Sequence, residues 1–369
     1  MKGPSWFKSM NRVLFAGGGT AGHIEPAWAV SQVWRKRFPG DEIAFLGTKN
    51  GQELEVIPER GGTLYLIPKV PAPRKLNIKT LAFPIELMVA VSKTIQIVKR
   101  FDVVVGFGGY VSASAYLAAI FLRKPIVLHD QNAKLGMANK LGSLFAKEVL
   151  LAYESSEFLK GKKKVKVVGN PLKSQIVSAA KSANGDWSKA RAQAKEQLKV
   201  NGRLLLVLGG SSGSVAINQV LFDALKESDE TLKDCTVIHS LGRSNQLPSA
   251  TDKYRPISYI EDMATALLAS DLVISRSGAI AITEFAALGK HALFVPLPIG
   301  NGEQAQNASE LVSAGKAEVI EQQDFTAKWL LANLQRLLSS GTAEPHGTNL
   351  NADELIADAI SRTLVGELK

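Results

Sequence analysis

The sequence has little cysteine and none of the motifs that bring a metal or an ATP phosphate with them. Cys235 is the single cysteine among 369 residues. This excludes a disulfide within the chain and a zinc site built from thiolates. Histidine, cysteine and aspartate do not recur at zinc-ligand spacing, and no P-loop lysine motif is present. We therefore expect no metal site and no cofactor, and we interpret Cys235 as a small buried apolar residue.

Long hydrophobic runs are missing as well. The longest candidate, Val111–Leu122, is shorter than the ~18–20 residues that a membrane-spanning helix needs, and it stops at Arg123-Lys124-Pro125. Residues 1–10 lead straight into a glycine-rich stretch, which predicts a flexible leader rather than a cleavable signal peptide.

Positive charge is what the chain has in excess. Lysine and arginine number 44 against 34 acidic residues, a formal net charge of +10. Such a balance suits nucleic acid, an anionic membrane surface or phosphorylated substrates. No nucleic-acid-binding motif accompanies it, so we expect no nucleic-acid partner.

Short apolar runs alternate with helical patterns through both halves of the chain. Runs such as Val13–Ala16, Asp102–Gly106 and Arg203–Leu208 lack in–out alternation and are separated by helical segments. This is typical of parallel sheets covered on both faces. We predict an α/β fold with two doubly wound Rossmann-like domains facing across a cleft. The expected domains are 11–171 and 172–352, with the C-terminal helix 353–369 packing back on the first.

The first glycine-rich loop, Ala16–Pro26, is the strongest candidate for a functional site. It follows a predicted strand and leads into a predicted helix over Ala27–Phe38, an arrangement that directs backbone N–H groups at an anion. His23 lies at the mouth of this loop, where an imidazole of near-neutral pKa can take a proton from a hydroxyl. The alternative is that His23 only caps the helix or packs on the turn.

A nicotinamide dehydrogenase is disfavoured although Gly17-x-Gly19-x-x-Gly22 fits the dinucleotide pattern. That pattern expects an acidic residue at the end of the second strand, where this chain has Gly47-Thr48-Lys49. Glu284, following the turn Arg276-Ser277-Gly278, is the better candidate for holding a ribose. Its alternative is a buried glutamate satisfied by backbone groups or by Arg276.

An Asp-x-Asp pair, which many nucleotide-sugar enzymes use to hold Mg²⁺ on the diphosphate, is also absent. A leaving diphosphate would then be stabilised by helix N-termini and by side chains.

The motifs together resemble the MurG family, the peripheral glycosyltransferases of peptidoglycan synthesis, and its actinobacterial members in particular. The segments that carry the resemblance occur in the family's order: Gly18–His23, Gly106–Ser112, His129–Asn132, Gly169–Pro171, Gly209–Ser211, Arg276–Ala279 and Gly302–Gln304.

The resemblance implies a two-domain GT-B fold with a donor-binding C-terminal domain and an acceptor-binding, membrane-facing N-terminal domain. It implies inverting, metal-independent transfer of N-acetylglucosamine from UDP-GlcNAc to the muramyl C4 hydroxyl of lipid I, giving lipid II. The implied location is the cytoplasmic face of the cell membrane. The implied partners are both substrates, anionic inner-leaflet lipids, and cell-division and cell-wall synthesis proteins.

The resemblance also assigns residues by matching positions. His23 is the expected general base, with Glu25 as the weaker candidate. The expected substrate-binding residues are Thr20, Ala21, Gly22, Tyr110, Asn132, Lys173, Ser211, Ile260, Arg276, Ala279, Ile280, Ala281, Ile282, Thr283, Glu284 and Gln304. Lys173 stands where the family usually has arginine, and Glu303-Gln304 stands where it often has two glutamines, so these two contacts depart from the family's pattern.

A mixed apolar and basic stretch, Leu76–Phe83, is the candidate membrane surface. Leu76, Ile78, Leu81 and Phe83 would dip into an anionic bilayer. The alternative is a helix start packed on the sheet.

Two other functions stay open. A UDP-GlcNAc 2-epimerase shares the doubly wound domains but needs no acceptor, and another UDP-sugar-dependent glycolipid transferase would use a different one. A binding protein without activity would release no UDP.

Overall fold

The computed structural model describes residues 10–70, 78–154, 159, 161–210, 212–227, 230–243, 245–298, 302–340 and 345–366. The contacts within the chain divide it into two units. Unit 1 comprises Met1–Pro171 and Asn351–Lys369, and unit 2 comprises Leu172–Leu350. Of the predicted leader, residues 1–9 lie outside the described residues.

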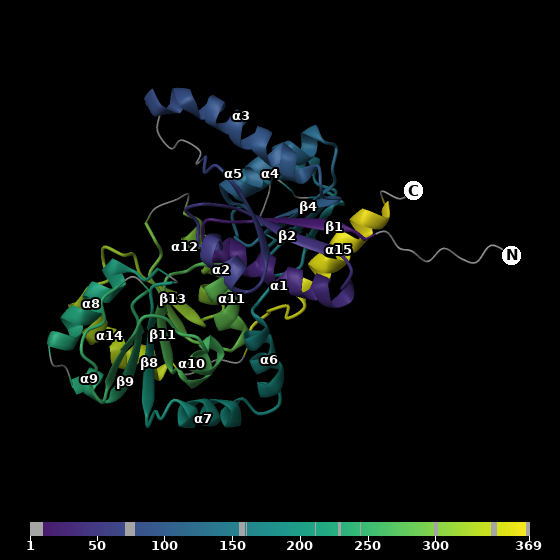
Figure 1. The fold of residues 1–369 in the computed structure, drawn as a ribbon. Coiled ribbons are helices and arrows are strands. Elements are labelled where there is room, and N and C mark those ends of the chain that lie inside the picture. The colour runs from purple at the N-terminus through teal and green to yellow at the C-terminus, as the bar shows by residue number, and fades with distance from the viewer. Residues whose placement is uncertain are drawn as a thin grey trace. The chain divides into compact units, whose positions relative to one another are not determined.

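Unit 1 is built on a seven-stranded parallel sheet of order β3-β2-β1-β4-β5-β6-β7 (Figure 1). Its strands are β1 (Arg12–Ala16), β2 (Glu42–Thr48), β3 (Thr63–Ile67), β4 (Val103–Gly106), β5 (Ile126–Asp130), β6 (Glu148–Leu151) and β7 (Val165–Val167). Its helices are α1 (Ala21–Arg37), α2 (Glu53–Glu59), α3 (Ile78–Val98), α4 (Gly109–Phe121), α5 (Met137–Phe145) and α15 (Ala352–Gly366).

Both faces of this sheet are covered. The β1 side chains alternate between the two cores: Leu14 packs with α4, while Val13 and Phe15 pack with α1 and α15. Ile356 and Ile360 of α15 are completely buried in the second core, so the last helix of the chain completes the first unit.

Unit 2 repeats the plan with a six-stranded parallel sheet of order β10-β9-β8-β11-β12-β13. Its strands are β8 (Arg203–Leu208), β9 (Cys235–Ser240), β10 (Tyr254–Ile257), β11 (Leu272–Ser275), β12 (Ala292–Phe294) and β13 (Ala317–Val319). Its helices are α6 (Ser174–Ala183), α7 (Trp187–Gln197), α8 (Val215–Lys226), α9 (Glu230–Lys233), α10 (Met263–Ala269), α11 (Ala279–Ala287), α12 (Glu303–Asn307), α13 (Ser309–Ser313) and α14 (Ala327–Ser339).

The two faces of the second sheet are covered in the same way. Residues of α6, α7, α10 and α11 pack on one face, and residues of α8 and α14 pack on the other. Cys235 is completely buried on β9, as its apolar surroundings in the sequence predict.

The predicted fold class of two doubly wound parallel sheets is confirmed, but several element boundaries differ. The first helix begins at Ala21, six residues earlier than predicted, so His23 lies in its first turn and Pro26 lies inside it. The pattern over Thr80–Phe101 predicts a helix with Pro84 in its first turn, but α3 begins at Ile78, which places Pro84 in the second turn. The stretch Ile257–Tyr259 predicts a short strand, but the strand lies at Tyr254–Ile257.

Candidate active site

Each sheet has one point at which the strand order reverses, so that the connections from two neighbouring strands run to opposite sides. In unit 1 it lies between β1 and β4, and in unit 2 between β8 and β11. Ligands of doubly wound folds bind beyond the carboxyl ends of the strands at such points. His23 lies in the first turn of α1, directly after the β1 loop, and Phe107 lies in the loop after β4. The loops that follow β8 and β11 hold the Gly209 and Arg276 turns.

The imidazole of His23 is held by a backbone carbonyl. Its Nδ1 lies 2.9 Å from the carbonyl oxygen of Phe107, in the loop after β4. A carbonyl oxygen can only accept, so Nδ1 carries the proton and Nε2 carries the lone pair. His23 is thus held in the tautomer that a general base requires.

Two glycines make room for this ring. A Cβ on Gly108 would lie 3.3 Å from Cε1 of His23, and a Cβ on Gly109 would lie 3.3 Å from its Cδ2. Both glycines have positive φ, of 94° and 78°. The turn after β4 is therefore shaped to seat the imidazole of His23 against bare backbone.

Burial lowers the pKa of His23 below its ordinary value of 6.5. The negative charges of Asp130 and Glu53 and the hydrogen bond to Phe107 act in the opposite direction and raise it. Because burial dominates, His23 is neutral at neutral pH and its Nε2 can accept a proton.

The side-chain amide of Gln131 also contacts Nδ1 of His23. Because that nitrogen carries a proton, the contact is attractive only when the amide oxygen of Gln131 faces it. Asp130, the preceding residue, accepts hydrogen bonds from the backbone N–H of Asn132 and of Gly136, both at 3.0 Å. The end of β5 is thereby ordered beside His23.

Glu25, the second candidate base, is engaged elsewhere. Its two carboxylate oxygens accept from the guanidinium of Arg60 at 2.8 and 3.0 Å. Both oxygens of the Glu25 carboxylate are thus occupied by one guanidinium. The geometry therefore favours His23 over Glu25 as the candidate base.

The remaining unit 1 candidates cluster around the first glycine loop. Thr20 is the N-cap of α1, and Ala21 and Gly22 are its first two residues, whose N–H groups have no acceptor within the helix. The ring of Tyr110 packs on Gly19, and its hydroxyl lies 3.3 Å from Oγ1 of Thr48.

In unit 2, two of the candidates support one loop. The guanidinium of Arg276 donates to the carbonyl oxygens of Val295 and Pro296 at 2.9 and 3.0 Å, and to Gln322. The amide oxygen of Gln304 accepts from the N–H of Leu297 at 3.0 Å. Arg276 and Gln304 thus converge on the segment that follows β12.

The other unit 2 candidates lie on or near α11 and α6. Ala279 through Glu284 form most of α11, and Glu284 is buried at 7% exposure. Ile260 is buried, and Lys173 is the N-cap of α6. Ser211 lies outside the described residues.

Two buried acids escaped the sequence analysis. Glu53 was not singled out, and Asp130 was given no role. An acidic residue in the first turn of a short helix normally complements the helix dipole at the surface, which is how Glu53 reads in the sequence. The glycines at 47 and 51 were the available signal that something bulky packs there.

The predicted membrane residues are described only in part. Leu76 lies outside the described residues, as do the side chains of Ile78 and Leu81, whereas Phe83 is half-buried. Exposed apolar side chains occur further along, on α3, α4 and α5: Ile85, Met88, Val89, Phe121, Met137, Leu144 and Phe145.

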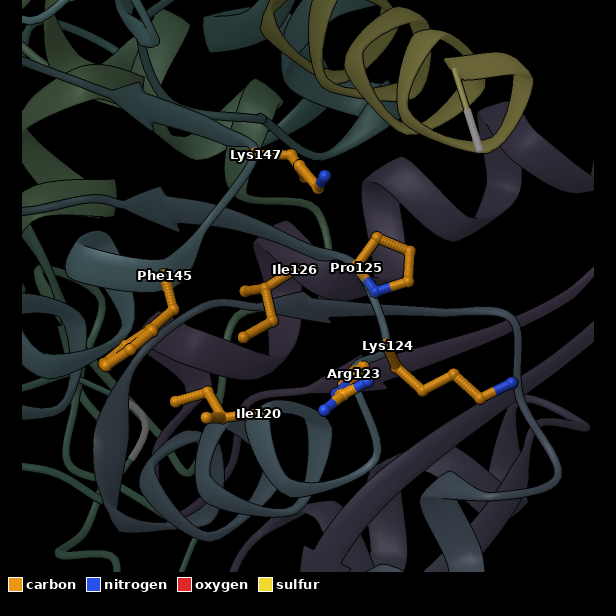
Figure 2. Close-up of a pocket in the computed structure, with 7 residues that line it drawn as sticks. All are labelled: Ile120, Arg123, Lys124, Pro125, Ile126, Phe145 and Lys147. Carbon is orange, nitrogen blue, oxygen red and sulfur yellow. The ribbon is translucent and has the colours of Figure 1, made fainter. Parts of the chain in front are cut away.

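A pocket opens beside the amino ends of β5 and β6 (Figure 2). His23 lies at the opposite end of the strands, because it follows the carboxyl end of β1. Its lining combines apolar side chains with three cations: Ile120, Arg123, Lys124, Pro125, Ile126, Phe145 and Lys147.

Within the described ranges, no group of three or more histidine, cysteine, aspartate or glutamate residues is placed to hold a metal ion. None of the helices in the described part of the chain is both long enough and apolar enough to cross a bilayer.

Comparison with known proteins gives matches over nearly the whole chain. The profile of the glycosyltransferase family 28 N-terminal domain matches residues 13–151, and that of its C-terminal domain matches residues 204–362. The UDP-N-acetylglucosamine–N-acetylmuramyl-(pentapeptide) pyrophosphoryl-undecaprenol N-acetylglucosamine transferase of Corynebacterium glutamicum strain R is 41% identical, over 96% of this chain and 98% of its own. The enzyme of the same name from Streptomyces coelicolor is 38% identical, over 90% of each chain.

Solved structures agree. The crystal structure of Acinetobacter baumannii MurG matches with a TM-score of 0.72 and 28% identity, covering 96% of this chain and all of the other. A UDP-N-acetylglucosamine 2-epimerase from Listeria monocytogenes matches with a TM-score of 0.65 but only 17% identity, which shows a shared fold alone. The two Rossmann-like sheets are those of the GT-B fold.

Proposed function

Because the chain belongs to the MurG family within glycosyltransferase family 28, we propose that it transfers N-acetylglucosamine from UDP-N-acetylglucosamine to lipid I, forming lipid II for peptidoglycan synthesis. The observation that carries this is the extent of the match: relatives of that name align with nearly the full length of the chain. An epimerase is not favoured, because the epimerase likeness lies in the fold and not in the sequence.

His23 is the general base of the proposed reaction. Its Nε2 takes the proton from the muramyl C4 hydroxyl, and the oxygen then attacks the anomeric carbon of N-acetylglucosamine. The bond from that carbon to the diphosphate breaks, and UDP leaves with the bonding electrons on the opposite face, which inverts the configuration. The tautomer set by the Phe107 carbonyl and the lowered pKa of His23 both support this role.

The other assigned residues act on binding. Thr20, Ala21 and Gly22 contribute backbone N–H groups near the phosphates and the acceptor, and Asn132 contacts the donor sugar. In unit 2, Ser211 and the start of α11 bind phosphate, Ile260 reads the uracil through its backbone, and Glu284 holds the ribose. Gln304 keeps amide N–H donors for sugar hydroxyls, because its oxygen is taken by Leu297.

The test is an assay of UDP release with a lipid I analogue, with product analysis by mass spectrometry. We expect UDP and lipid II in equal amounts. UDP-ManNAc from donor alone would instead identify an epimerase, and donor binding without UDP release would identify a binding protein.

His23→Ala tests the base. Turnover should fall by ~10²–10⁴-fold, as loss of a general base does, while the affinity for UDP-GlcNAc in calorimetry stays near that of the wild type. Glu25→Gln removes the other candidate. Wild-type turnover in His23→Ala together with inactivity in Glu25→Gln would reverse the assignment.

The acceptor carries an undecaprenyl chain, so we propose that unit 1 also rests on the membrane. Exposed apolar residues of α3, α4 and α5 lie on helices that pack against one another, and Arg123, Lys124 and Lys147 line the pocket beside Phe145 (Figure 2). Apolar side chains among cations suit the interface of an anionic bilayer.

A further inference from the structure

Glu53 is a buried carboxylate at the start of α2, and only 1% of it is exposed. Its Oε2 accepts from the N–H of Gly19 at 2.8 Å, and its Oε1 accepts from the N–H of Thr48 at 2.8 Å and faces the Thr48 hydroxyl at 3.3 Å. The side chain therefore joins the loop after β1 to the end of β2. A buried carboxylate is retained only where such donors replace its water.

The surrounding backbone is shaped to admit this side chain. A Cβ on Gly18 would lie 2.7 Å from Oε1 of Glu53, and a Cβ on Gly47 or Gly51 would overlap its side-chain atoms. Three glycines thus leave room for one carboxylate: Gly18 in the loop after β1, Gly47 at the end of β2 and Gly51 in the loop after β2. Among the described ion pairs, none involves Glu53, so its charge is balanced there by hydrogen-bond donors alone.

The bond to Gly19 determines where the loop points. Gly19 has a φ of 94°, and the helix begins two residues later. Within α1 the N–H of His23 bonds to the carbonyl oxygen of Thr20, so the N–H groups without an acceptor inside the helix are those of Ala21 and Gly22. Gly19 lies directly before this turn, so its bond to Glu53 fixes where these N–H groups and the imidazole of His23 lie.

We propose that Glu53 is a positioning residue of the transfer reaction: it holds the first glycine loop so that the Ala21 and Gly22 N–H groups and Nε2 of His23 meet the substrates in the right geometry. The inference rests on the proposed function, because it assigns the base to His23. It adds a residue that reaches the reacting atoms through the loop and touches neither substrate.

Glu53 also acts on His23 through its charge. The charged groups that act on this histidine are Asp130 at the end of β5 and Glu53 on α2, and both raise its pKa against the larger effect of burial. The ring otherwise faces uncharged groups, which are Gly108, Gly109, the carbonyl of Phe107 and the side-chain amide of Gln131. Removing the Glu53 charge should therefore lower the pKa of His23 further.

The decisive variant is Glu53→Gln, which keeps the shape of the side chain but replaces one carboxylate oxygen with an N–H₂ group. That group cannot accept a hydrogen bond, so either the N–H of Gly19 or the N–H of Thr48 loses its acceptor. We expect kcat to fall on the order of 10²-fold, because a small displacement of reacting groups lowers the rate by that factor. The affinity for the donor should stay within about 2-fold of the wild-type value. The acid limb of kcat should move to lower pH. The matched control is Glu55→Gln, an exposed residue of the same helix turn, which should leave kcat, affinity and pH profile unchanged.

Two further measurements distinguish the proposed role of Glu53 from an effect on folding and from a failure of the assigned reaction. Glu53→Asp keeps the charge but shortens the side chain, so kcat should fall while the acid limb stays in place. The titration of His23 by NMR, assigned with His23→Ala, should shift to lower pH in Glu53→Gln whether or not the enzyme turns over.

Wild-type kcat and an unmoved His23 titration in a folded Glu53→Gln would overturn the inference. So would an equal loss of donor affinity, kcat and thermal stability, because that pattern describes a purely structural residue. Absence of UDP release from the wild type would instead overturn the proposed function, and the NMR titration would still decide on Glu53.

Discussion

At the residue scale, the protonation of His23 should be visible in the kinetics. Burial lowers the pKa of His23 below 6.5, and the neutral form is the one that can act as the proposed base. The rate should therefore be constant at neutral pH and fall only as the pH drops through this lowered pKa. A profile of kcat/KM against pH should show its acid limb below pH 6.5, and an acid limb above that value would contradict the assignment.

Asp130 should move that limb further than Glu53 does. It is the largest of the effects that raise the pKa of His23. In Asp130→Asn the amide oxygen can still accept one backbone N–H, while the charge is lost. The acid limb should shift to lower pH, and by more than in Glu53→Gln, in the same kinetic measurement. A shift to higher pH, or a shift no larger than that of the exposed control Glu55→Gln, would be the contrary result.

At the scale of elements, the close approach of two loops restricts which residues the glycine turn of unit 2 can accept. Gly213 has a φ of 77°, and a Cβ there would overlap the carbonyl of Leu241. Gly210, in the same turn, has a φ of 83° but no described atom within 4 Å of its Cβ position. A residue with a side chain would therefore be strained in its backbone at both positions, but it would clash with a neighbouring loop only at position 213.

Gly210→Ala should cost about 1–2 kcal/mol of unfolding free energy, the strain of a left-handed alanine. Gly213→Ala should cost about 1–3 kcal/mol more, because the loop at Leu241 must move, and donor affinity should fall with it. Denaturant unfolding and calorimetry with UDP-GlcNAc measure both effects. Equal losses in the two variants would mean that the close approach does not limit this turn.

The sequence located the glycine turns but misplaced the elements beside them. The helix after the first turn was predicted from Ala27, whereas the structure begins α1 at Ala21 and keeps Pro26 inside it. Helices α5 and α14 were not predicted at all. For α14 the signal was present, since Leu330, Leu334, Leu337 and Leu338 recur at helical spacing and are buried.

At the scale of the whole molecule, the +10 net charge and the apolar residues of unit 1 predict binding to anionic membranes. The full chain should sediment with vesicles that contain anionic phospholipid and much less with zwitterionic ones. High salt should weaken binding, because exposed charges are screened. Binding that ignores lipid charge and salt would contradict this surface.

The apolar part of that surface can be tested with a matched control. Phe121 and Phe145 are 72% and 53% exposed in unit 1, and Val215 is 80% exposed in unit 2. The double variant Phe121→Ser and Phe145→Ser should reduce vesicle binding by about 10-fold, since each removes buried apolar area at the interface. Val215→Ser should bind as the wild type does, and an equal loss in both would show that the effect is not local.

What the sequence determined by itself was the architecture, because it is written in local patterns, whereas the resemblance of the ordered motifs to the MurG family implied the chemistry. Unbroken apolar runs between helical segments specify parallel sheets. The tertiary structure decided which polar groups meet. The Phe107 carbonyl lies 84 positions from His23, and Glu53 lies 34 positions from Gly19. Only parallel pairing of distant strands brings their carboxyl ends together, so no local pattern could reveal that a buried glutamate bonds to the loop before His23.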